Sequence, residues 1–172
     1  ETGTGGPFLP IGNVVFVEKA DSTGKALEKI RIIRESAAGL PLAKPLQFGR
    51  FSSNFGYRVD PFLRKPAMHS GVDFAAAYGT PVEATADGIV VHAGFKGGYG
   101  RLVEIRHGHG FNTRYAHMSA ISVKEGEQVA AGTIVGHVGS SGRSTGPHLH
   151  YETRRGDKAL DPTIFLGASQ YF

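Results

Sequence analysis

Two histidines separated by a single residue are the most informative feature of this sequence. His148 and His150 belong to a run that predicts a strand, in which alternate side chains share one face and their Cα atoms lie roughly 6–7 Å apart. Two imidazoles at that spacing can serve one small polar site. A second segment supplies His69 and, four residues later, Asp73. Together these side chains offer the imidazoles and the carboxylate of a three-ligand zinc site with an open fourth position.

The types of ligand favour zinc over harder ions. Calcium and magnesium prefer shells of oxygen atoms, whereas two imidazoles and one carboxylate match zinc, and iron(II) accepts the same set. A structural zinc site is normally closed by four ligands, commonly thiolates, and this chain has no cysteine. The sequence therefore predicts an open, catalytic site. His117, in the run Tyr115-Ala116-His117, offers a further imidazole.

The segment between His69 and Asp73 has to bend. In an extended strand the two Cα atoms would lie roughly 13 Å apart, which is too far for both side chains to bind one ion. The intervening residues, Ser70 to Val72, form a poor helix sequence. We therefore expect a bend at Gly71, where the absence of a side chain allows it.

Short β-branched runs punctuated by glycine follow from about residue 46. Strands are predicted over residues 88–94, 101–107, 111–117, 133–138 and 148–154. The turn Gly108-His109-Gly110 predicts a hairpin connection. The glycine-rich loops at 94–100 and 139–147 are natural walls for an extended peptide groove, or serve only to close hairpins. The pattern predicts a mainly β fold, a single antiparallel β-sheet domain over 46–172 with an N-terminal helical arm.

The arm covers residues 7–45. Apolar side chains at helical spacing predict a helix over 24–37, and Pro41 and Pro45 indicate a linker into the main domain. The run Val14-Val15-Phe16-Val17 is compatible with a short strand. Residues 1–6 resemble an expression remnant, so we expect upstream sequence, with any export signal or membrane anchor, to have been removed.

Composition narrows the class of protein. The chain has 172 residues, of which 40% are hydrophobic, enough for one core of ordinary size, and it lacks the ~18–20 consecutive apolar residues of a membrane span. A net charge of +4 permits an anionic partner. The basic residues are scattered and not interleaved with aromatic ones, so we do not expect nucleic acid binding. The four remaining strand and turn histidines are interpreted as structural: His92, His107, His109 and His137.

Four motifs resemble the lysostaphin-type (LytM-domain) zinc peptidases, which cut peptide bonds in peptidoglycan. The motifs are FGYRVDP at 55–61, MHSGVDF at 68–74, RYAHMS at 114–119 and SGRSTGPHLHYE at 141–152. The resemblance runs from about Phe51 to Phe165. It implies one Zn²⁺ held by His69, Asp73 and His150, with His117 and His148 as catalytic histidines that do not bind the metal.

The resemblance implies a zinc endopeptidase that hydrolyses stem peptides or cross-links of peptidoglycan in the periplasm or cell wall. A D-alanyl–diaminopimelate bond is expected in a Gram-negative source, and glycine bridges in a Gram-positive one. A glutamate base on a helix, as in zincins, is missing, so proton transfer is expected from His117 and His148, with their two roles left open.

Two alternatives remain at this point. Some relatives have lost these ligands and act as regulators of other cell-wall hydrolases, but this chain keeps all five positions, which favours activity. A regulatory protein partner or membrane anchor is expected to act through upstream sequence. Residues 123–136 also resemble half of a biotinyl or lipoyl carrier domain, although no lysine stands at a hairpin tip there.

Overall fold

The computed structural model describes residues 23–29, 31, 39–61 and 63–168, and it divides into two units. In the first unit, residues 1–37, the described positions 23–29 and 31 are helical, and Arg31 pairs with Glu28 at 2.9 Å. The rest of the predicted helix and the Val14–Val17 run lie outside the described residues. Among those that are described, no helix is long and apolar enough to cross a membrane.

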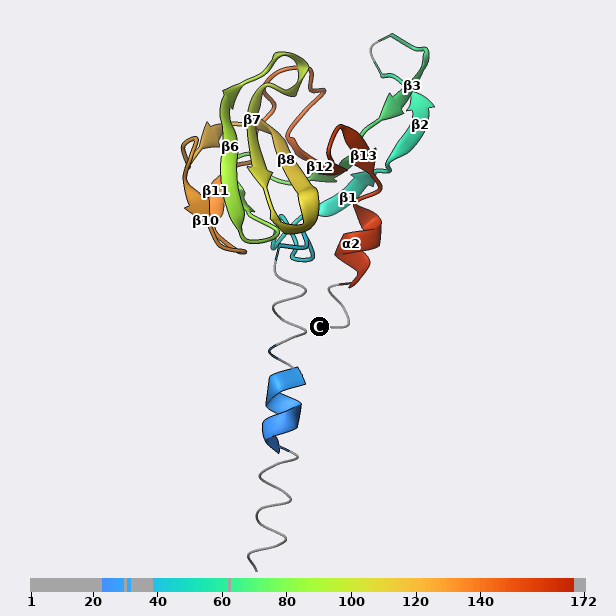
Figure 1. The fold of residues 1–172 in the computed structure, drawn as a ribbon. Coiled ribbons are helices and arrows are strands. Elements are labelled where there is room, and N and C mark those ends of the chain that lie inside the picture. Colours follow the sequence, from blue (N-terminus) through green and yellow to red (C-terminus); the bar gives the residue numbers. More distant parts are fainter. Residues whose placement is uncertain (1–22, 30, 32–38, 62, 169–172) are drawn as a thin grey trace, which may run out of the picture. The chain divides into compact units, whose positions relative to one another are not determined.

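The second unit, residues 38–172, consists mainly of strands (Figure 1). In chain order these are β1 (Arg50–Ser53), β2 (Gly56–Val59), β3 (Pro66–His69), β4 (Val72–Ala75), β5 (Pro81–Glu83), β6 (Gly88–Phe95), β7 (Arg101–Arg106), β8 (Phe111–Met118), β9 (Ala120–Ile121), β10 (Gln128–Val129), β11 (Ile134–His137), β12 (His148–Arg155) and β13 (Lys158–Leu160). Two 3₁₀ turns, η1 (Gly97–Tyr99) and η2 (Gly108–Gly110), flank β7, and helix α2 (Thr163–Ala168) follows β13. The predicted mainly β fold is confirmed, and each of the five predicted runs forms a strand.

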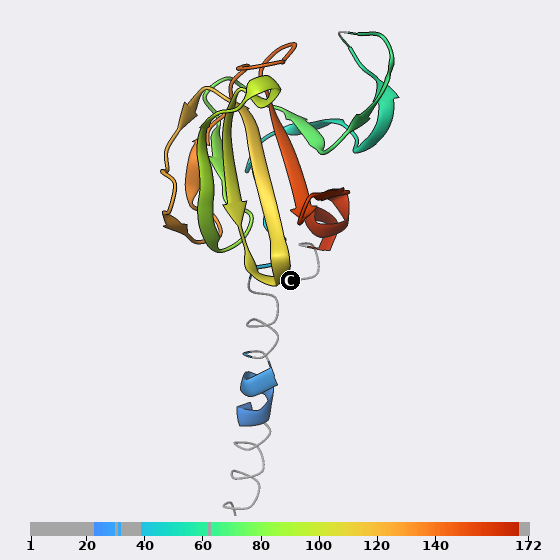
Figure 2. The same ribbon diagram turned by 45° about the horizontal axis from the view of Figure 1, so that its top comes forward.

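The described strands pair antiparallel in three sheets. The largest has the order β1-β4-β12-β8-β7-β6-β10, with β13 added beside β12. A three-stranded sheet has the order β5-β11-β9, and β2 and β3 form a separate hairpin. In Figure 2 the long strands β6, β7, β8 and β12 lie side by side as one curved surface. Strand β12 of this surface carries His148 and His150.

Side-chain alternation along β12 separates an apolar core from a polar face. Leu149 and Tyr151 are fully buried in the core cluster, which also contains Val103 of the large sheet and Val135 of the three-stranded sheet. Because successive strand residues point to opposite faces, His150 projects away from this core. Burial of the alternate apolar residues therefore fixes which face presents the histidines.

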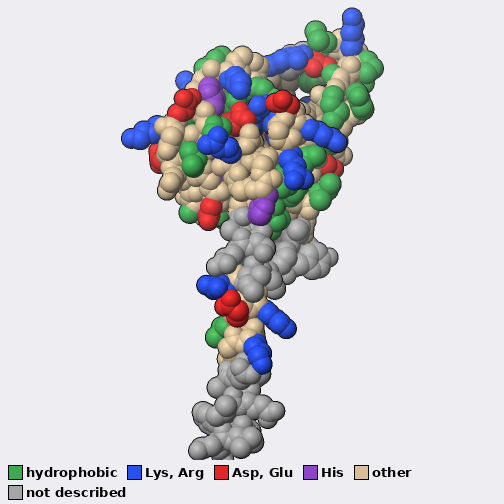
Figure 3. Space-filling view, in the orientation of Figure 1, with side chains coloured by type: hydrophobic (Ala, Val, Ile, Leu, Met, Phe, Trp, Pro, Cys, Tyr) green, Lys and Arg blue, Asp and Glu red, His purple; other side chains and the backbone are tan. Residues whose placement is uncertain are grey.

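The β2–β3 hairpin protrudes from the domain (Figure 1). Tyr57 and Val59 are 87% and 60% exposed, and hydrophobic side chains gather over this hairpin in the space-filling view of Figure 3. Arg58, between them, projects from the other face of the strand and lines a cavity at the polar face of the large sheet. The hairpin thus contributes a wall to the site described next.

Candidate metal centre

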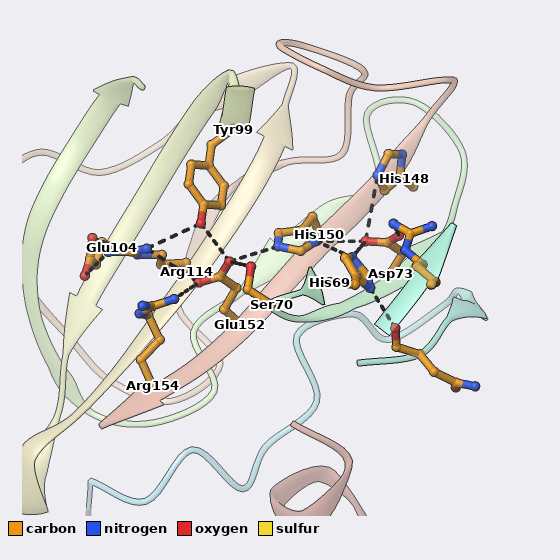
Figure 4. Close-up of polar contacts among 12 residues, drawn as sticks. His69, Ser70, Asp73, Tyr99, Glu104, Arg114, His148, His150, Glu152 and Arg154 are labelled. Carbon is orange, nitrogen blue, oxygen red and sulfur yellow. Dashed lines mark hydrogen bonds and ion pairs between the residues drawn. The ribbon is translucent and has the colours of Figure 1, made fainter. Parts of the chain in front are cut away.

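Three buried side chains from three strands converge on one point. Nε2 of His69 lies 3.1 Å from Oδ1 of Asp73, and Nδ1 of His150 lies 2.9 Å from the same oxygen. The two ring nitrogens are themselves 3.1 Å apart (Figure 4). Strands β4 and β12 are neighbours and place His150 opposite Asp73 in register. The structure therefore brings together the three residues that the sequence predicts as a ligand set.

The chain turns between β3 and β4 at Ser70 and Gly71, as the sequence predicts. The reason for glycine is close packing against β12, because a Cβ on Gly71 would lie 2.3 Å from the carbonyl oxygen of Tyr151. Gly71 is absent from the positive-φ glycines, so an unusual backbone conformation is not the cause. A larger residue would push β12, and with it His150, away from Asp73.

Backbone and carboxylate partners fix the protons on the two converging histidines. Nδ1 of His69 contacts the carbonyl oxygen of Asn54 at 2.7 Å, and a carbonyl can only accept, so in the neutral ring Nε2 of His69 carries the lone pair. Nε2 of His150 donates to Oε1 of Glu152 at 3.2 Å, so in the neutral ring Nδ1 carries the lone pair. Burial would lower the pKa of His150, but hydrogen bonds to Asp73 and Glu152 raise it.

When both rings are neutral, three acceptor atoms face one another at this point. Burial alone would raise the pKa of Asp73, but hydrogen bonds and the proximity of His150 and His69 lower it well below its ordinary value, so the carboxylate is ionised. Lone pairs at such distances repel unless a cation lies among them. Two imidazole nitrogens and a carboxylate oxygen, each held by a further partner, suit Zn²⁺.

Glu152 is a buried carboxylate that the sequence did not single out. It is fully buried and accepts hydrogen bonds from Ser70, from Tyr99 at 2.8 Å and from Arg154 at 2.8 Å (Figure 4). Burial would raise the pKa of Glu152, but hydrogen bonds from His150, Ser70 and Arg154 lower it to about 2. The strand rule that pairs His148 with His150 also places Glu152 on the same face, so this signal was available.

His117 and His148 stand beside the converging atoms, with ring centroids 4.8 Å apart. His117 has φ 60, a conformation that is uncommon for a residue other than glycine and that concentrates at functional sites. Its Nδ1 donates to the carbonyl of Ser141, and Nδ1 of His148 donates to that of Gly146, each at 2.8 Å. Both rings therefore have an unprotonated Nε2. Burial, with the nearby His148 and His150, lowers the pKa of His117 to about 4, so the ring is neutral near pH 7.

All five predicted site residues line one cavity of about 320 Å³. Both predicted loops contribute walls, through Tyr99 and Arg143 among others, whereas the wall formed by the β2–β3 hairpin was not predicted. Gly142 and Gly100 allow the two loops to pack closely, since a Cβ on Gly142 would lie 2.3 Å from the backbone nitrogen of Gly100. This packing role was not among the two readings of the loop glycines.

The comparison with protein families identifies the family to which this domain belongs. Residues 67–162 match the family model described as Peptidase family M23, and this region contains His69, Asp73, His117, His148 and His150. The chain belongs to peptidase family M23. The resemblance to lysostaphin-type peptidases is thereby confirmed.

Relatives of this M23 domain include characterised cell-wall enzymes. The DD-carboxypeptidase/endopeptidase Mpg of Neisseria meningitidis serogroup B is 53% identical over 119 residues, which are 69% of this chain and 27% of that protein. The chain thus spans about a quarter of the length of such curated relatives.

Solved structures share the fold of this M23 domain. The catalytic domain of lysostaphin from Staphylococcus simulans matches with a TM-score of 0.65 and 35% identity, over 69% of this chain and 92% of that one. A zinc containing peptidase from Vibrio cholerae matches with a TM-score of 0.65 and 34% identity, over 72% of this chain and 39% of that one.

Proposed function

We propose that this chain is the peptidase domain of a zinc-dependent endopeptidase that hydrolyses peptide bonds in peptidoglycan. In this proposal His69, Asp73 and His150 bind one Zn²⁺, and His117 and His148 are catalytic. The observation that carries it is the convergence of two imidazole nitrogens and a carboxylate oxygen in a cavity that also holds two further histidines. Membership of family M23 and the zinc containing relative support the choice of metal.

Zinc in this site would lower the pKa of a bound water to about 7 and polarise the peptide carbonyl. His117 and His148 supply the proton transfers, since each has Nδ1 fixed on a carbonyl, which leaves Nε2 of the neutral ring as an acceptor. Either Nε2 can accept the proton of the attacking water. The same nitrogen, once protonated, becomes a donor to the oxyanion or to the leaving amine.

We infer that the scissile bond joins two D-residues, as in a D-alanyl–diaminopimelate cross-link. The relative named a DD-carboxypeptidase/endopeptidase, at 53% identity, supports this bond over the glycine bridges. A peptidoglycan substrate implies that the domain works in the cell envelope, after export.

Digestion of purified peptidoglycan by the zinc-loaded protein tests this function. We expect mass spectrometry to show cross-linked dimers converted to monomers by hydrolysis of a DD bond, and His148→Ala to leave the dimers intact. If the active-site residues bind zinc and the polymer but leave every cross-link uncut, the alternative of a non-catalytic regulator replaces this proposal.

A further inference from the structure

Arg58 lies at the edge of the cavity, against the carboxylate of the proposed metal ligand Asp73. Its Nη2 is 3.4 Å from Oδ2 of Asp73, while Oδ1 of the same carboxylate faces His69 and His150. The Arg58 side chain is 39% exposed and lines the cavity. A guanidinium carries five N–H donors, and among the described residues the contact with Asp73 is the one ion pair that Arg58 makes.

The geometry of this contact is poor for an arginine that serves only to orient Asp73. A carboxylate and a guanidinium matched to each other form two short parallel hydrogen bonds, at roughly 2.7–2.9 Å. Arg58 makes a single contact of 3.4 Å, at the weak end of the hydrogen-bond range. Most of its donors are therefore available to a ligand in the cavity.

Arg143, the second arginine that lines the cavity, makes a shorter ion pair than Arg58 does. Nη2 of Arg143 donates to Oδ1 of Asp60 at 2.7 Å, and the backbone of Arg143 is fixed to Gly98 at 2.8 Å. Arg58 and Arg143 together offset the charges of Asp60 and Asp73, so a bound divalent cation leaves the cavity positively charged. The cavity then favours an anionic substrate group, and Arg58 is the cation whose N–H donors are mostly available to bind it.

Peptide bonds between two D-residues carry such a group beside the cleaved amide. The residue on the amine side bears a free carboxylate on its Cα, both in a terminal D-alanyl–D-alanine and at the D-centre of diaminopimelate in a D-alanyl–diaminopimelate cross-link. That carboxylate carbon lies within roughly 4 Å of the scissile carbonyl carbon, because only the nitrogen and Cα separate them. A bond inside a glycine bridge has no carboxylate at this position.

We propose that Arg58 binds this carboxylate through two N–H groups, and that this contact selects substrates with an anion next to the scissile amide. The inference rests on the proposed function, because it requires a DD peptide bond at the metal. One anion site then accounts for both carboxypeptidase and endopeptidase action on the same type of bond.

Two stem pentapeptides test the inference, identical except that one ends in D-alanyl–D-alanine as the acid and the other as the C-terminal amide. We expect the zinc-loaded wild-type protein to prefer the acid by roughly 10- to 100-fold in kcat/KM, the range for a hydrogen bond between charged groups. Arg58→Gln should lose this preference, mainly through KM, and Arg58→Lys should keep part of it. Arg143→Gln, the matched control, removes the same charge from the cavity but no proposed hydrogen bond to the carboxylate, so it should keep most of the wild-type preference.

The ratio of acid to amide within one variant cancels any change in zinc occupancy that follows from the contact between Arg58 and Asp73. Where turnover is too slow, calorimetric dissociation constants for the two peptides give the same ratio. The inference is wrong if Arg58→Gln keeps the wild-type ratio of acid to amide, or if the wild-type protein shows no preference. Cleavage of the peptides would in either case still support the proposed function. Failure of the wild-type protein to cut peptidoglycan or either peptide overturns the proposed function, and the inference with it.

Discussion

Strand β12 takes part in a buried polar cluster on each of its two faces, and the clusters differ in the groups that meet there. On the site face, Nε2 of His69, Nδ1 of His150 and Oδ1 of Asp73 meet at 2.9–3.1 Å, and the partners of both rings hold the protons on the far nitrogens. When both rings are neutral, this cluster has acceptors in excess, which suits a bound cation.

The cluster on the core face is satisfied by its own hydroxyl groups. The Tyr115 hydroxyl contacts the backbone nitrogen of Thr85 at 2.9 Å and the Thr113 hydroxyl at 3.0 Å. Nδ1 of His107 donates to a carbonyl at 2.8 Å, and its Nε2 contacts the Thr113 hydroxyl at 2.6 Å. Both clusters contain buried histidine, so burial alone does not identify a functional site. The site cluster differs because three groups that can bind a metal ion converge there.

The largest effect is expected from removing a converging acceptor. His150→Ala or Asp73→Ala should lose the metal, because three protein ligands leave little redundancy, and cleavage should fall by more than about 10³-fold with the loss of the activated water. Elemental analysis together with a muropeptide assay measures both. Full zinc occupancy in purified His150→Ala would contradict the ligand assignment.

Replacement of the neighbouring histidines should separate chemistry from metal binding. His117→Ala and His148→Ala should keep their zinc while kcat falls by roughly 10²–10⁴-fold, the usual contribution of a general acid or base. Steady-state kinetics on cross-linked muropeptides, with zinc content measured in parallel, provide the check. Near-wild-type turnover in either variant would demote that histidine to a structural role.

The convergence of the predicted residues in one cavity could be anticipated from the sequence because they follow local rules. The two-residue period of a strand predicts that His148 and His150 share a face, and the poor helix sequence around Gly71 predicts a bend. Arg58 and Glu152 were missed as site residues because their importance depends on tertiary contacts. Only the approach of the hairpin to Asp73 gives Arg58 its partner, and only the fold brings Ser70 and Tyr99 to Glu152.

The fold can likewise be divided into features that local sequence patterns predict and features that depend on tertiary contacts. The long β-branched runs were predicted, whereas the short strands and α2, which has six residues, are too short for periodicity to reveal. The partition of the strands into three sheets follows from which strands meet across long sequence separations, such as β4 with β12. No local pattern encodes those pairings.

Glu152→Gln should weaken zinc binding by roughly 10- to 100-fold, because the charge that holds the proton on Nε2 of His150 is removed. Glu104→Gln is the matched control. Glu104 pairs with Arg114 at 3.0 Å in the same polar network, but Glu152 lies between Arg114 and His150, so Glu104 does not contact the histidine. Competition with a chelator of known affinity gives the two dissociation constants. Equal constants for the two variants would show that Glu152 is only a packing residue.

Tyr151→Phe changes the core cluster and should have the opposite signature. The Tyr151 hydroxyl contacts Thr85 at 3.0 Å inside the core, so its loss should lower the free energy of unfolding by about 1–3 kcal/mol. Zinc affinity should stay at the wild-type value. Chemical denaturation and the chelator assay on the same preparation distinguish the two clusters, and a loss of zinc affinity would show that they are coupled.

The smallest effect concerns pH. Burial lowers the pKa of His107 below its ordinary value of 6.5, so the unfolded chain binds a proton more readily than the folded one. His107 therefore stabilises the fold fully above pH 6.5, and this contribution decreases as the pH falls toward the folded pKa. Denaturation of the metal-free protein between about pH 7.5 and about pH 5.5 should show a shallower decline for His107→Gln than for wild type. Parallel curves would exclude His107 as a source of the pH dependence.

X-ray diffraction from crystals of the zinc-loaded protein, recorded on both sides of the zinc absorption edge, tests the central claim most directly. We expect an anomalous peak bonded to Nε2 of His69, Oδ1 of Asp73 and Nδ1 of His150, with His117 and His148 unbound and still donating to their carbonyls. A peak bonded to Nε2 of His150, to His117 or His148, or located away from these side chains would contradict the account.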